Sequence, residues 1–274
     1  MAGGNSRGPT LSVKAVFRGL AGGYGTGMSP PKNPIVVIPS RLAASRLPNK
    51  PIADIHGVPM IVHVWRRAME ADIGPVIVAC ADFEIIDAVK EAGGDAIYTN
   101  PAHASGSDRV FEALHTVDPL KKHDVVVNIQ GDLPTLDAAV VQASLEPLAN
   151  AGVDIATLAA EITLEAERDN PNVVKAVIAK ADGANTGRAL YFSRARVPSG
   201  DVPLYHHIGL YAFRREALET FVKLPPGNLE RQEKLEQLRA LENGMRIDVR
   251  LVDTVPLGVD TPADLERARE MLKP

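Results

Sequence analysis

Two arginines and a lysine follow the first strongly apolar segment of the chain, with no acidic residue near them. Residues 35–38 are typical of a buried strand, and Arg41, Arg46 and Lys50 lie in the loop after it, ahead of the first acidic residue, Asp54. In α/β proteins, ligands bind beyond the carboxyl ends of the strands. Arg and Lys suit phosphate oxygens there, as a fork and as a point charge. The loop is therefore predicted to bind a polyphosphate or, as the alternative, to be a solvated surface loop.

A single aspartate follows a second apolar segment. Residues 125–129 predict another buried strand, and Gln130, Gly131 and Asp132 come directly after it. A carboxylate at this edge of a sheet suits Mg²⁺, which proteins bind through one or two carboxylates plus phosphate oxygens. Asp132 could also cap the turn that it begins. Both interpretations remain open from the sequence.

A second candidate carboxylate, Asp260, precedes the start of a predicted helix. Thr261, Pro262 and Asp264 have the types expected of an N-cap, a first helical residue and an acidic third residue. Asp260 is not needed for that cap. It would complete a magnesium site if the fold brought it beside Asp132, which the sequence cannot show.

Small residues open another predicted helix at Ser105, Gly106 and Ser107. Backbone N–H groups at such a start could bind an anion or the edge of a base. Capping of the helix by Ser105 or Ser107 explains the same residues.

A histidine pair falls on a predicted strand over residues 206–213. Strand alternation places His207 and Tyr211 on one face and His206 on the other, so the two histidines cannot share a metal ion. The seven histidines and one cysteine show no zinc-binding spacing. The predicted helix over 229–242 carries three glutamates spaced by three residues, Glu230, Glu233 and Glu236, a pattern typical of a solvated face.

The elements that must position these residues alternate between strand and helix. Strands are predicted at 35–38, 75–79, 96–98 and 125–129, and helices near 59–72, 82–92, 105–117 and 137–149. Strands that are apolar throughout indicate a parallel sheet with both faces covered. Further strands are predicted at 153–160, 173–179, 188–193 and 206–213, and helices at 229–242 and 261–272. These later strands are less regularly separated by helices, which indicates mixed or antiparallel pairing, as in an arm or a dimer surface.

The composition limits the class of protein. With 274 residues and 45% hydrophobic residues, the chain can bury a full core. A net charge of −4 does not favour nucleic-acid binding, and a locally basic loop in such a chain indicates a small anionic substrate. Cys80 is the single cysteine of the sequence, which excludes an intrachain disulfide, and it is predicted to be a core residue. No apolar stretch is long enough for a membrane helix.

The first 32 residues differ from the rest, since they are basic, rich in Gly and free of acids. That composition overlaps with a transit peptide, but Gly and Pro are too frequent for a persuasive amphipathic helix. We expect a disordered extension over 1–32, with Met28 as an alternative start, and a single domain over 33–274.

Taken together and in order, the motifs closely resemble those of the 3-deoxy-manno-octulosonate cytidylyltransferases, or CMP-Kdo synthetases. Three of them are Asn128-Ile-Gln-Gly-Asp132, His206-His-Ile-Gly-Leu-Tyr211 and Gly258-Val-Asp-Thr-Pro262. The others lie at residues 38–51, 103–109, 170–175, 189–194 and 235–239. The match covers about 34 to 272 and leaves only the N-terminal segment outside it.

The resemblance implies a fold and a reaction. The fold is a Rossmann-like, glycosyltransferase-A-like α/β nucleotidyltransferase with a mainly parallel sheet flanked by helices. A smaller mixed-strand region, roughly 170–215, is implied for dimerisation and sugar binding. The reaction transfers CMP from CTP to the anomeric hydroxyl of Kdo and releases pyrophosphate, for lipopolysaccharide synthesis in the cytoplasm by a homodimer. No nucleic acid or membrane partner is implied.

The resemblance also implies residue roles. Arg41 and Lys50 hold the triphosphate, and Asp132 and Asp260 ligate Mg²⁺. Ser105, Gly106, Ser107 and the backbone around Ala43 lie near the nucleoside. The implied sugar-facing residues are Gln130, Arg194, His207, Tyr211 and Glu236.

Two departures from the family pattern concern the acceptor. Leu133 replaces a glutamate often found after the aspartate, and the loop after Arg194 lacks the tryptophan often found after its proline. The alternative substrates are therefore related acid sugars, 8-amino-Kdo or a sialic acid. A non-catalytic nucleotide-sugar-binding protein is a rival from another class, but Lys50, Asp132 and Asp260 are all present. The sequence lacks the glycine motif of a nicotinamide oxidoreductase and that of a Walker-type NTPase, which argues against both classes.

Overall fold

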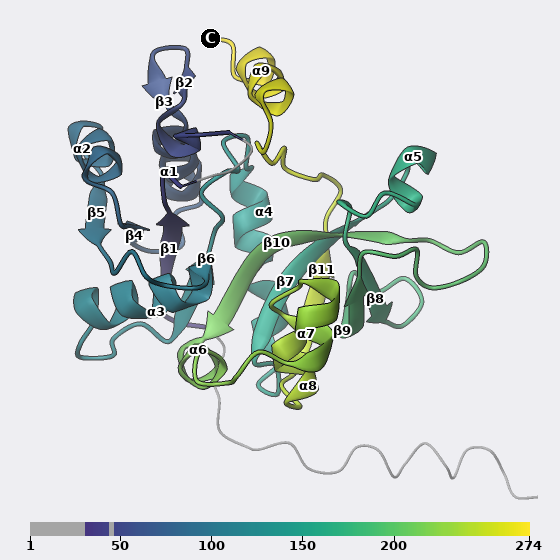
Figure 1. Cartoon of the computed structure of the whole chain (residues 1–274). Helices are drawn as coiled ribbons and strands as arrows, with labels where there is room; N and C mark the ends of the chain where they lie inside the picture. Colours follow the sequence, from purple (N-terminus) through teal and green to yellow (C-terminus); the bar gives the residue numbers. More distant parts are fainter. Residues whose placement is uncertain (1–30, 44–46) are drawn as a thin grey trace, which may run out of the picture.

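A nine-stranded sheet forms the centre of the protein in the computed structural model, which describes residues 31–43 and 47–274 (Figure 1). The strand order is β5-β4-β1-β6-β10-β7-β11-β9-β8. Most of the expected N-terminal extension, residues 1–30, lies outside the described residues.

Four parallel strands form one half of the sheet, as predicted. They are β5 (Asp95–Tyr98), β4 (Val76–Cys80), β1 (Pro34–Ser40) and β6 (Val125–Asn128). The helices that follow β1, β4 and β5 are α1 (Met60–Glu70), α2 (Phe83–Glu91) and α3 (Gly106–Val117). Because β1 and β6 are parallel neighbours, their carboxyl ends lie at the same edge of the sheet. Crossover connections join parallel strands of this kind.

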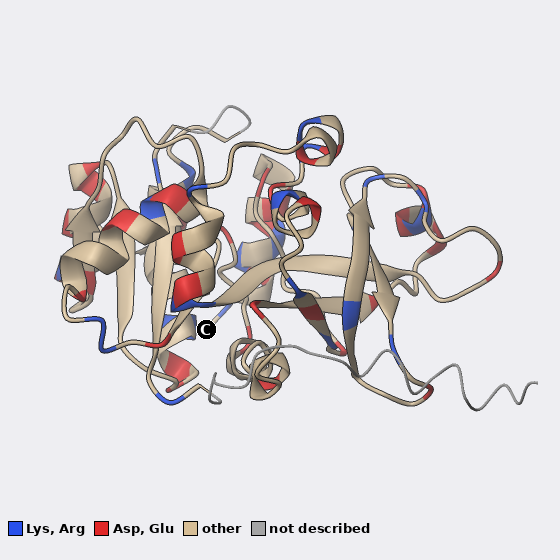
Figure 2. Ribbon diagram, turned by 90° about the horizontal axis from the view of Figure 1, so that it is seen from below, with Lys and Arg blue, Asp and Glu red and all other residues tan. Residues whose placement is uncertain are grey.

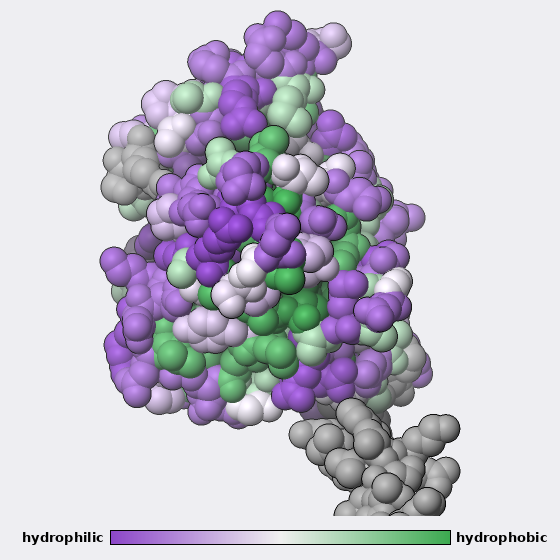
Figure 3. All heavy atoms as spheres, turned by 90° about the vertical axis from the view of Figure 1, so that its right-hand side faces the viewer, coloured by the Kyte–Doolittle hydropathy of each residue, from purple (hydrophilic) through white to green (hydrophobic). Residues whose placement is uncertain are grey.

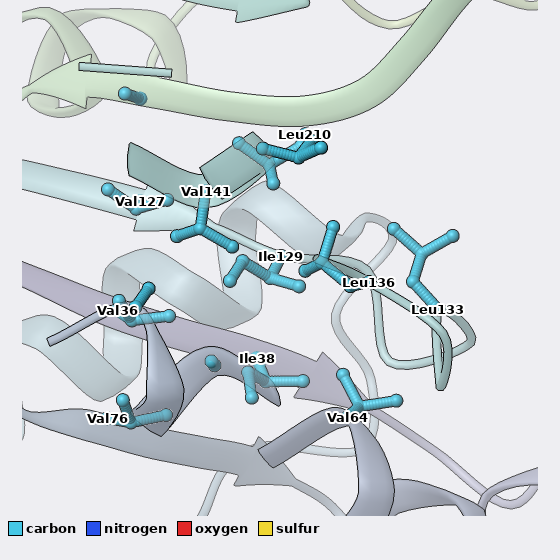
Figure 4. Packing of buried hydrophobic residues seen from close by; sticks show 14 of the residues in the cluster. Val36, Ile38, Val64, Val76, Val127, Ile129, Leu133, Leu136, Val141 and Leu210 are labelled. Atoms are coloured by element: carbon cyan, nitrogen blue, oxygen red, sulfur yellow. The ribbon is translucent and has the colours of Figure 1, made fainter. Parts of the chain in front are cut away.

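The alternation of side chains along β1 divides the core into two layers. Val36 and Ile38 pack with α1, α2 and α4 (Ala138–Ala143) on one face, and Figure 4 shows part of this cluster. Ile35 and Val37 pack with α3, α6 (Arg215–Phe221) and α8 (Leu238–Glu242) on the other face. Strands buried on both faces are apolar throughout, which is why the sequence pattern predicted them. Cys80 is fully buried in the first cluster, and burial raises the pKa of its thiol to about 11.

Five strands form the other half, and they continue the same sheet. They are β10 (Tyr205–Arg214), β7 (Ile155–Glu161), β11 (Ile247–Leu251), β9 (Thr186–Ser193) and β8 (Lys175–Ala179). β10 is antiparallel to both β6 and β7, while β11 is parallel to β7. β8 also meets β10 at His206 and Lys175, so this half curls on itself. The mixed pairing predicted for the later strands is therefore confirmed, although it begins at β7, ahead of the expected region 170–215, and these strands continue the main sheet.

Two predicted long helices are each broken in the structure. The predicted helix 137–149 divides into α4 and a 3₁₀ turn, η3 (Glu146–Ala149), where Pro147 cannot continue an α-helix. The predicted helix 229–242 divides into α7 (Asn228–Glu233) and α8, because Lys234 adopts a left-handed conformation at φ 56°. The expectation that Glu230, Glu233 and Glu236 share one helix face was therefore wrong.

Helix α9 (Pro262–Met271) lies where it was predicted, with the expected cap. The sequence patterns missed strand β11, helix α6 and several short elements. The short elements are η2 (Lys50–Ile52), β2 (Asp54–Ile55), β3 (Val58–Pro59) and α5 (Glu165–Arg168).

Candidate functional site

A cleft of about 370 Å³ lies at the carboxyl ends of β1 and β6, beside the start of α3. Its lining includes most of the residues that the resemblance implies for the nucleotide and the metal. These are Arg41, Ala43, Lys50, Ser105, Gly106, Asp132 and Asp260, and Gln130 of the implied sugar-facing set lines the cleft as well. The cleft is therefore where a ligand is expected in a parallel α/β sheet.

The two aspartates meet at a single lysine. The Nζ atom of Lys50 lies 2.8 Å from Oδ2 of Asp132 and 3.1 Å from Oδ1 of Asp260. The backbone N–H of Val259 donates to the carbonyl of Asp132 over 3.0 Å, which ties the segment before α9 to the end of β6. The proximity of the two carboxylates, which the sequence could not establish, is thus confirmed.

Local sequence explains how the three side chains are held. A Cβ on Gly131 would lie 2.9 Å from the carbonyl oxygen of Pro39, so only glycine allows the ends of β1 and β6 to come so close. Pro51 stabilises the 3₁₀ turn that begins at Lys50. Thr261 caps α9 with Asp264 in a reciprocal capping box, so that Asp260 lies just outside the helix.

Electrostatics keep the lysine charged. Burial alone would lower the pKa of the Lys50 ammonium, but attraction and hydrogen bonds from Asp132 and Asp260 outweigh burial and raise it. Elsewhere, acidic and basic residues are interspersed over the helices (Figure 2). The cleft therefore combines a positive loop with a pair of carboxylates that are already neutralised in part.

The first turn of α3 separates two environments. Ser105 is the N-cap, and its hydroxyl accepts from the N–H of Asp108 over 3.2 Å while it lines the cleft. Ser107 is buried, and its Oγ donates to Oε2 of Glu236 over 3.0 Å. Capping by Ser105 is confirmed, and Ser107 contacts the sugar-facing set.

Within the described part of the chain, the other sugar-facing residues that the resemblance implies do not line this cleft. His207 and Tyr211 lie on β10, with ring centroids 5.5 Å apart. Tyr211 is opposite Asn128 in the ladder with β6, and Asn128 accepts from Gln130 over 3.5 Å. Gln130 therefore connects the cleft to the layer that contains His207 and Tyr211.

Burial controls the ionisation of this layer. It lowers the pKa of His207 to about 3 and raises the pKa of Tyr211 well above its usual range. Burial also raises the pKa of the Glu236 carboxyl, against hydrogen bonds that lower it. The Oε1 atom of Glu236 is buried and lacks a hydrogen-bond partner among the described residues. His207 is neutral near pH 7, and its Nε2 lies 3.0 Å from Oγ1 of Thr157.

Arg194 supports the break between α7 and α8. Its guanidinium donates to the carbonyls of Glu233 and Pro171, over 2.9 and 3.0 Å. The carboxylate of Glu233 in turn accepts from the backbone N–H of Arg194 over 3.0 Å and from Oγ of Ser193 over 2.8 Å. Contact between Arg194 and a sugar remains a prediction.

Sequence reasoning missed three polar residues around the site. Arg109 lines the cleft although it is only 3% exposed, and it donates to Thr99. His103 also lines the cleft and pairs with Glu112. Glu233 was assigned to a solvated face. Arg109 and His103 lie within the matching segment 103–109, which was the available signal.

Leu133 has become a core residue. It is 8% exposed and lies beside Leu136 in the cluster (Figure 4), and a Cβ on Gly258 would lie 3.9 Å from its Cδ2. The residue that replaces the family's glutamate therefore packs under the segment that leads to Asp260.

The donor set suits one kind of metal. No group of three His, Cys, Asp or Glu side chains that could hold an ion occurs among the described residues. Two carboxylates that converge on one cation beside a basic loop nevertheless fit Mg²⁺, which commonly takes further ligands from phosphate and water. In residues 31–43 and 47–274, no helix has the length and apolar character needed to span a membrane.

Comparisons with known proteins agree with this geometry. A family model described as cytidylyltransferase matches residues 35–247. A 3-deoxy-manno-octulosonate cytidylyltransferase from Rhodospirillum centenum is 68% identical over 89% of this chain and 95% of its own length. A relative of the same name from Paramagnetospirillum magneticum is 65% identical over 88% of this chain and 98% of its own.

Solved structures extend the comparison to the fold. A CMP:2-keto-3-deoxy-manno-octonic acid synthetase complexed with CTP superposes with a TM-score of 0.81 and 38% identity, over 88% of this chain and 98% of that chain. A 4-diphosphocytidyl-2C-methyl-D-erythritol synthase from Anaerococcus prevotii reaches a TM-score of 0.59 at 13% identity, over 89% and 99% of the two chains. The second likeness concerns the fold alone, which is that of an α/β nucleotidyltransferase.

Proposed function

The chain belongs to the 3-deoxy-manno-octulosonate cytidylyltransferase family, and on that premise we propose that its cleft transfers CMP from CTP to the anomeric hydroxyl of Kdo, with release of pyrophosphate. The observation that carries the proposal is the convergence of Lys50, Asp132 and Asp260 at the carboxyl ends of β1 and β6. The named relatives do not favour 8-amino-Kdo or a sialic acid as the acceptor.

The nucleotide side works by charge. Arg41 and Lys50 would neutralise the triphosphate and stabilise the departing pyrophosphate, and no covalent intermediate on the protein is needed. Ser105, Gly106 and the backbone at Ala43 would border the nucleoside, since they line the same cleft. Positioning and charge neutralisation then supply most of the rate enhancement.

Asp132 and Asp260 would hold Mg²⁺. When bound, the ion would supply Lewis-acid polarisation of a phosphoryl oxygen and lower the pKa of a coordinated hydroxyl. The two aspartates would keep the cleft from becoming purely cationic, so that phosphate and a neutral hydroxyl can bind side by side.

The sugar side works by shape and hydrogen bonds. Gln130 connects the cleft to Tyr211, and the buried Oε1 of Glu236, which no described residue hydrogen-bonds, can accept from a sugar hydroxyl. A buried acceptor of this kind rejects analogues that lack the hydroxyl, because it would remain unpaired. His207, held neutral by burial, would orient Tyr211 rather than attract the sugar carboxylate.

The proposal includes a homodimer in the cytoplasm that serves lipopolysaccharide synthesis, as the family resemblance implies. An apolar area on the face at the β8–β9 end of the sheet supports the dimer (Figure 3). Leu190 of β9, a strand at that end of the sheet, is 56% exposed.

Pyrophosphate release from CTP, Mg²⁺ and Kdo tests the proposed function. The expected result is release that depends on Kdo and is absent without sugar. Release only with 8-amino-Kdo would keep the chemistry and change the acceptor. No release with either sugar would contradict the proposal.

A further inference from the structure

The ammonium of Lys50 lies where a divalent cation would have to bind. It contacts one oxygen of each aspartate, at 2.8 and 3.1 Å, and these are the carboxylates that fit Mg²⁺. The Lys50 side chain is only 15% exposed, whereas those of Asp132 and Asp260 are 31% and 48% exposed. The lysine is thus the most buried of the three side chains.

An ammonium and a divalent ion cannot share these two carboxylates without strong repulsion, since like charges at contact distance repel more in a partly desolvated cleft than in water. A metal ion must therefore compete with Lys50. An intramolecular competitor is always present, and its effective concentration is high.

A triphosphate offers Lys50 an alternative partner in the same cleft. Arg41, directly after β1, also lines this cleft and would draw phosphate toward it. Lys50 has a flexible four-carbon side chain on a 3₁₀ turn that Pro51 fixes, so its ammonium can move while its backbone stays in place.

We propose that Lys50 acts as an internal counter-ion that keeps divalent metal off Asp132 and Asp260 until a nucleoside triphosphate draws its ammonium away. The inference rests on the proposed function and adds its regulation: metal and nucleotide binding are coupled. Coupling is reciprocal, so the metal should also tighten CTP binding.

Binding of Mn²⁺ to the full chain without nucleotide tests this directly, measured by loss of the free-ion signal in electron paramagnetic resonance. Lys50→Met should bind Mn²⁺ at least tenfold more tightly than the unmodified chain. Arg41→Met is the matched control, because it removes one positive charge from the same cleft without removing a contact to Asp132. Thermal melting of each variant checks that it is folded.

Two results would overturn the proposal. One is equal Mn²⁺ affinity, including no detectable binding, in the unmodified chain and Lys50→Met. The other is an equal gain in Arg41→Met, which would indicate net charge rather than competition. Adding Asp260→Asn to Lys50→Met should abolish the gained binding, and binding that persists would place the ion elsewhere.

A second measurement separates this inference from the proposed function. With CTP present and sugar absent, the unmodified chain should enhance water-proton relaxation by Mn²⁺ beyond that of Mn²⁺ and CTP alone. No enhancement would contradict the metal site itself. Enhancement together with tight Mn²⁺ binding in the absence of CTP would contradict only the gating by Lys50.

Discussion

In the parallel half of the sheet the site residues lie in loops beyond the strand ends. In the mixed half they lie on strand β10 and in the segment between helices α7 and α8. Lys50 and Asp132 are partly exposed and interact mainly through charge. His207 and Tyr211 lie on β10, where burial shifts both of their pKa values. A loop side chain can be replaced with little effect on packing, while a buried strand residue also supports the core.

This contrast has a functional consequence. A polyphosphate is flexible and highly charged, so mobile cations on loops suit it. A sugar must be distinguished by the positions of its hydroxyls, so rigid and desolvated partners suit it. Substitutions of the charged loop residues in the first region should change activity alone, and those in the second region should change stability as well.

The largest expected effect is on turnover in Asp260→Ala. Turnover should fall by roughly a thousandfold, equivalent to about 4 kcal/mol of activation free energy, because one carboxylate of the proposed metal pair is lost. CTP should still bind, since Arg41 and Lys50 remain. Pyrophosphate release and CTP titration measure the two quantities. Asp253→Ala, at an exposed aspartate on the same segment, is the control and should be unaffected. Normal turnover of Asp260→Ala at saturating Mg²⁺ would rule out this metal assignment.

A smaller effect, on stability, is expected in the mixed half from Glu233→Ala. The free energy of unfolding should fall by about 3 kcal/mol, because Ser193 and the backbone N–H of Arg194 lose a charged acceptor. The KM for Kdo should rise more than the KM for CTP. Chemical denaturation and steady-state kinetics are the measurements, with Glu216→Ala on the exposed face of α6 as the control. Unchanged stability would mean that the junction of α7 and α8 is held by other contacts.

The buried imidazole of His207 predicts a pH dependence of stability. Burial lowers its pKa from 6.5 to about 3, so between these values the unfolded chain binds a proton that the folded chain does not. The stability that this group contributes is therefore fully present above pH 6.5 and is lost as the pH falls toward 3. Between pH 7.5 and 5 this group should lower the free energy of unfolding by about 2 kcal/mol. Over the same pH interval, the free energy of unfolding of His207→Gln, measured by urea denaturation, should fall by about 2 kcal/mol less than that of the unmodified protein. An equal loss in both proteins would place the titration elsewhere.

The smallest expected effects compare two serines on either side of the first turn of α3. Ser105→Ala should lower the free energy of unfolding by about 1 kcal/mol, because the N-cap is lost. It should also raise the KM for CTP, and Ser107→Ala should instead raise the KM for Kdo through Glu236. The same change in both KM values for both variants would mean that the first turn does not separate the two substrates.

The sequence predicted the parallel half well, because each strand there is apolar on both faces and is bounded by loops. Asp132 and Asp260 could be identified as candidates as well, since Asp132 follows a predicted strand and Asp260 precedes a predicted helix cap. Their meeting could not be predicted, because it depends on the backbone hydrogen bond between Val259 and Asp132, far apart in sequence.

The mixed half was predicted less well. Residues 247–251 do alternate apolar and polar side chains, but they were not assigned to a strand. No glycine or proline marks the break at Lys234, whose left-handed conformation depends on tertiary contacts: α7 packs on α8, α8 packs on β9, and Glu233 of α7 binds Ser193 of β9. Glu233 therefore seemed to lie on a solvated helix face, although it binds Ser193 and Arg194. Burial of Arg109 likewise depends on tertiary contacts that no local pattern shows.

The most direct test of the division between the two regions is the KM of each substrate in Glu236→Gln. This change keeps the size of the side chain and its contact with Ser107 while removing its charge. We expect the KM for Kdo to rise at least tenfold and the KM for CTP to stay within twofold. An equal rise in both values, or a rise for CTP alone, would contradict the assignment of this layer to the sugar.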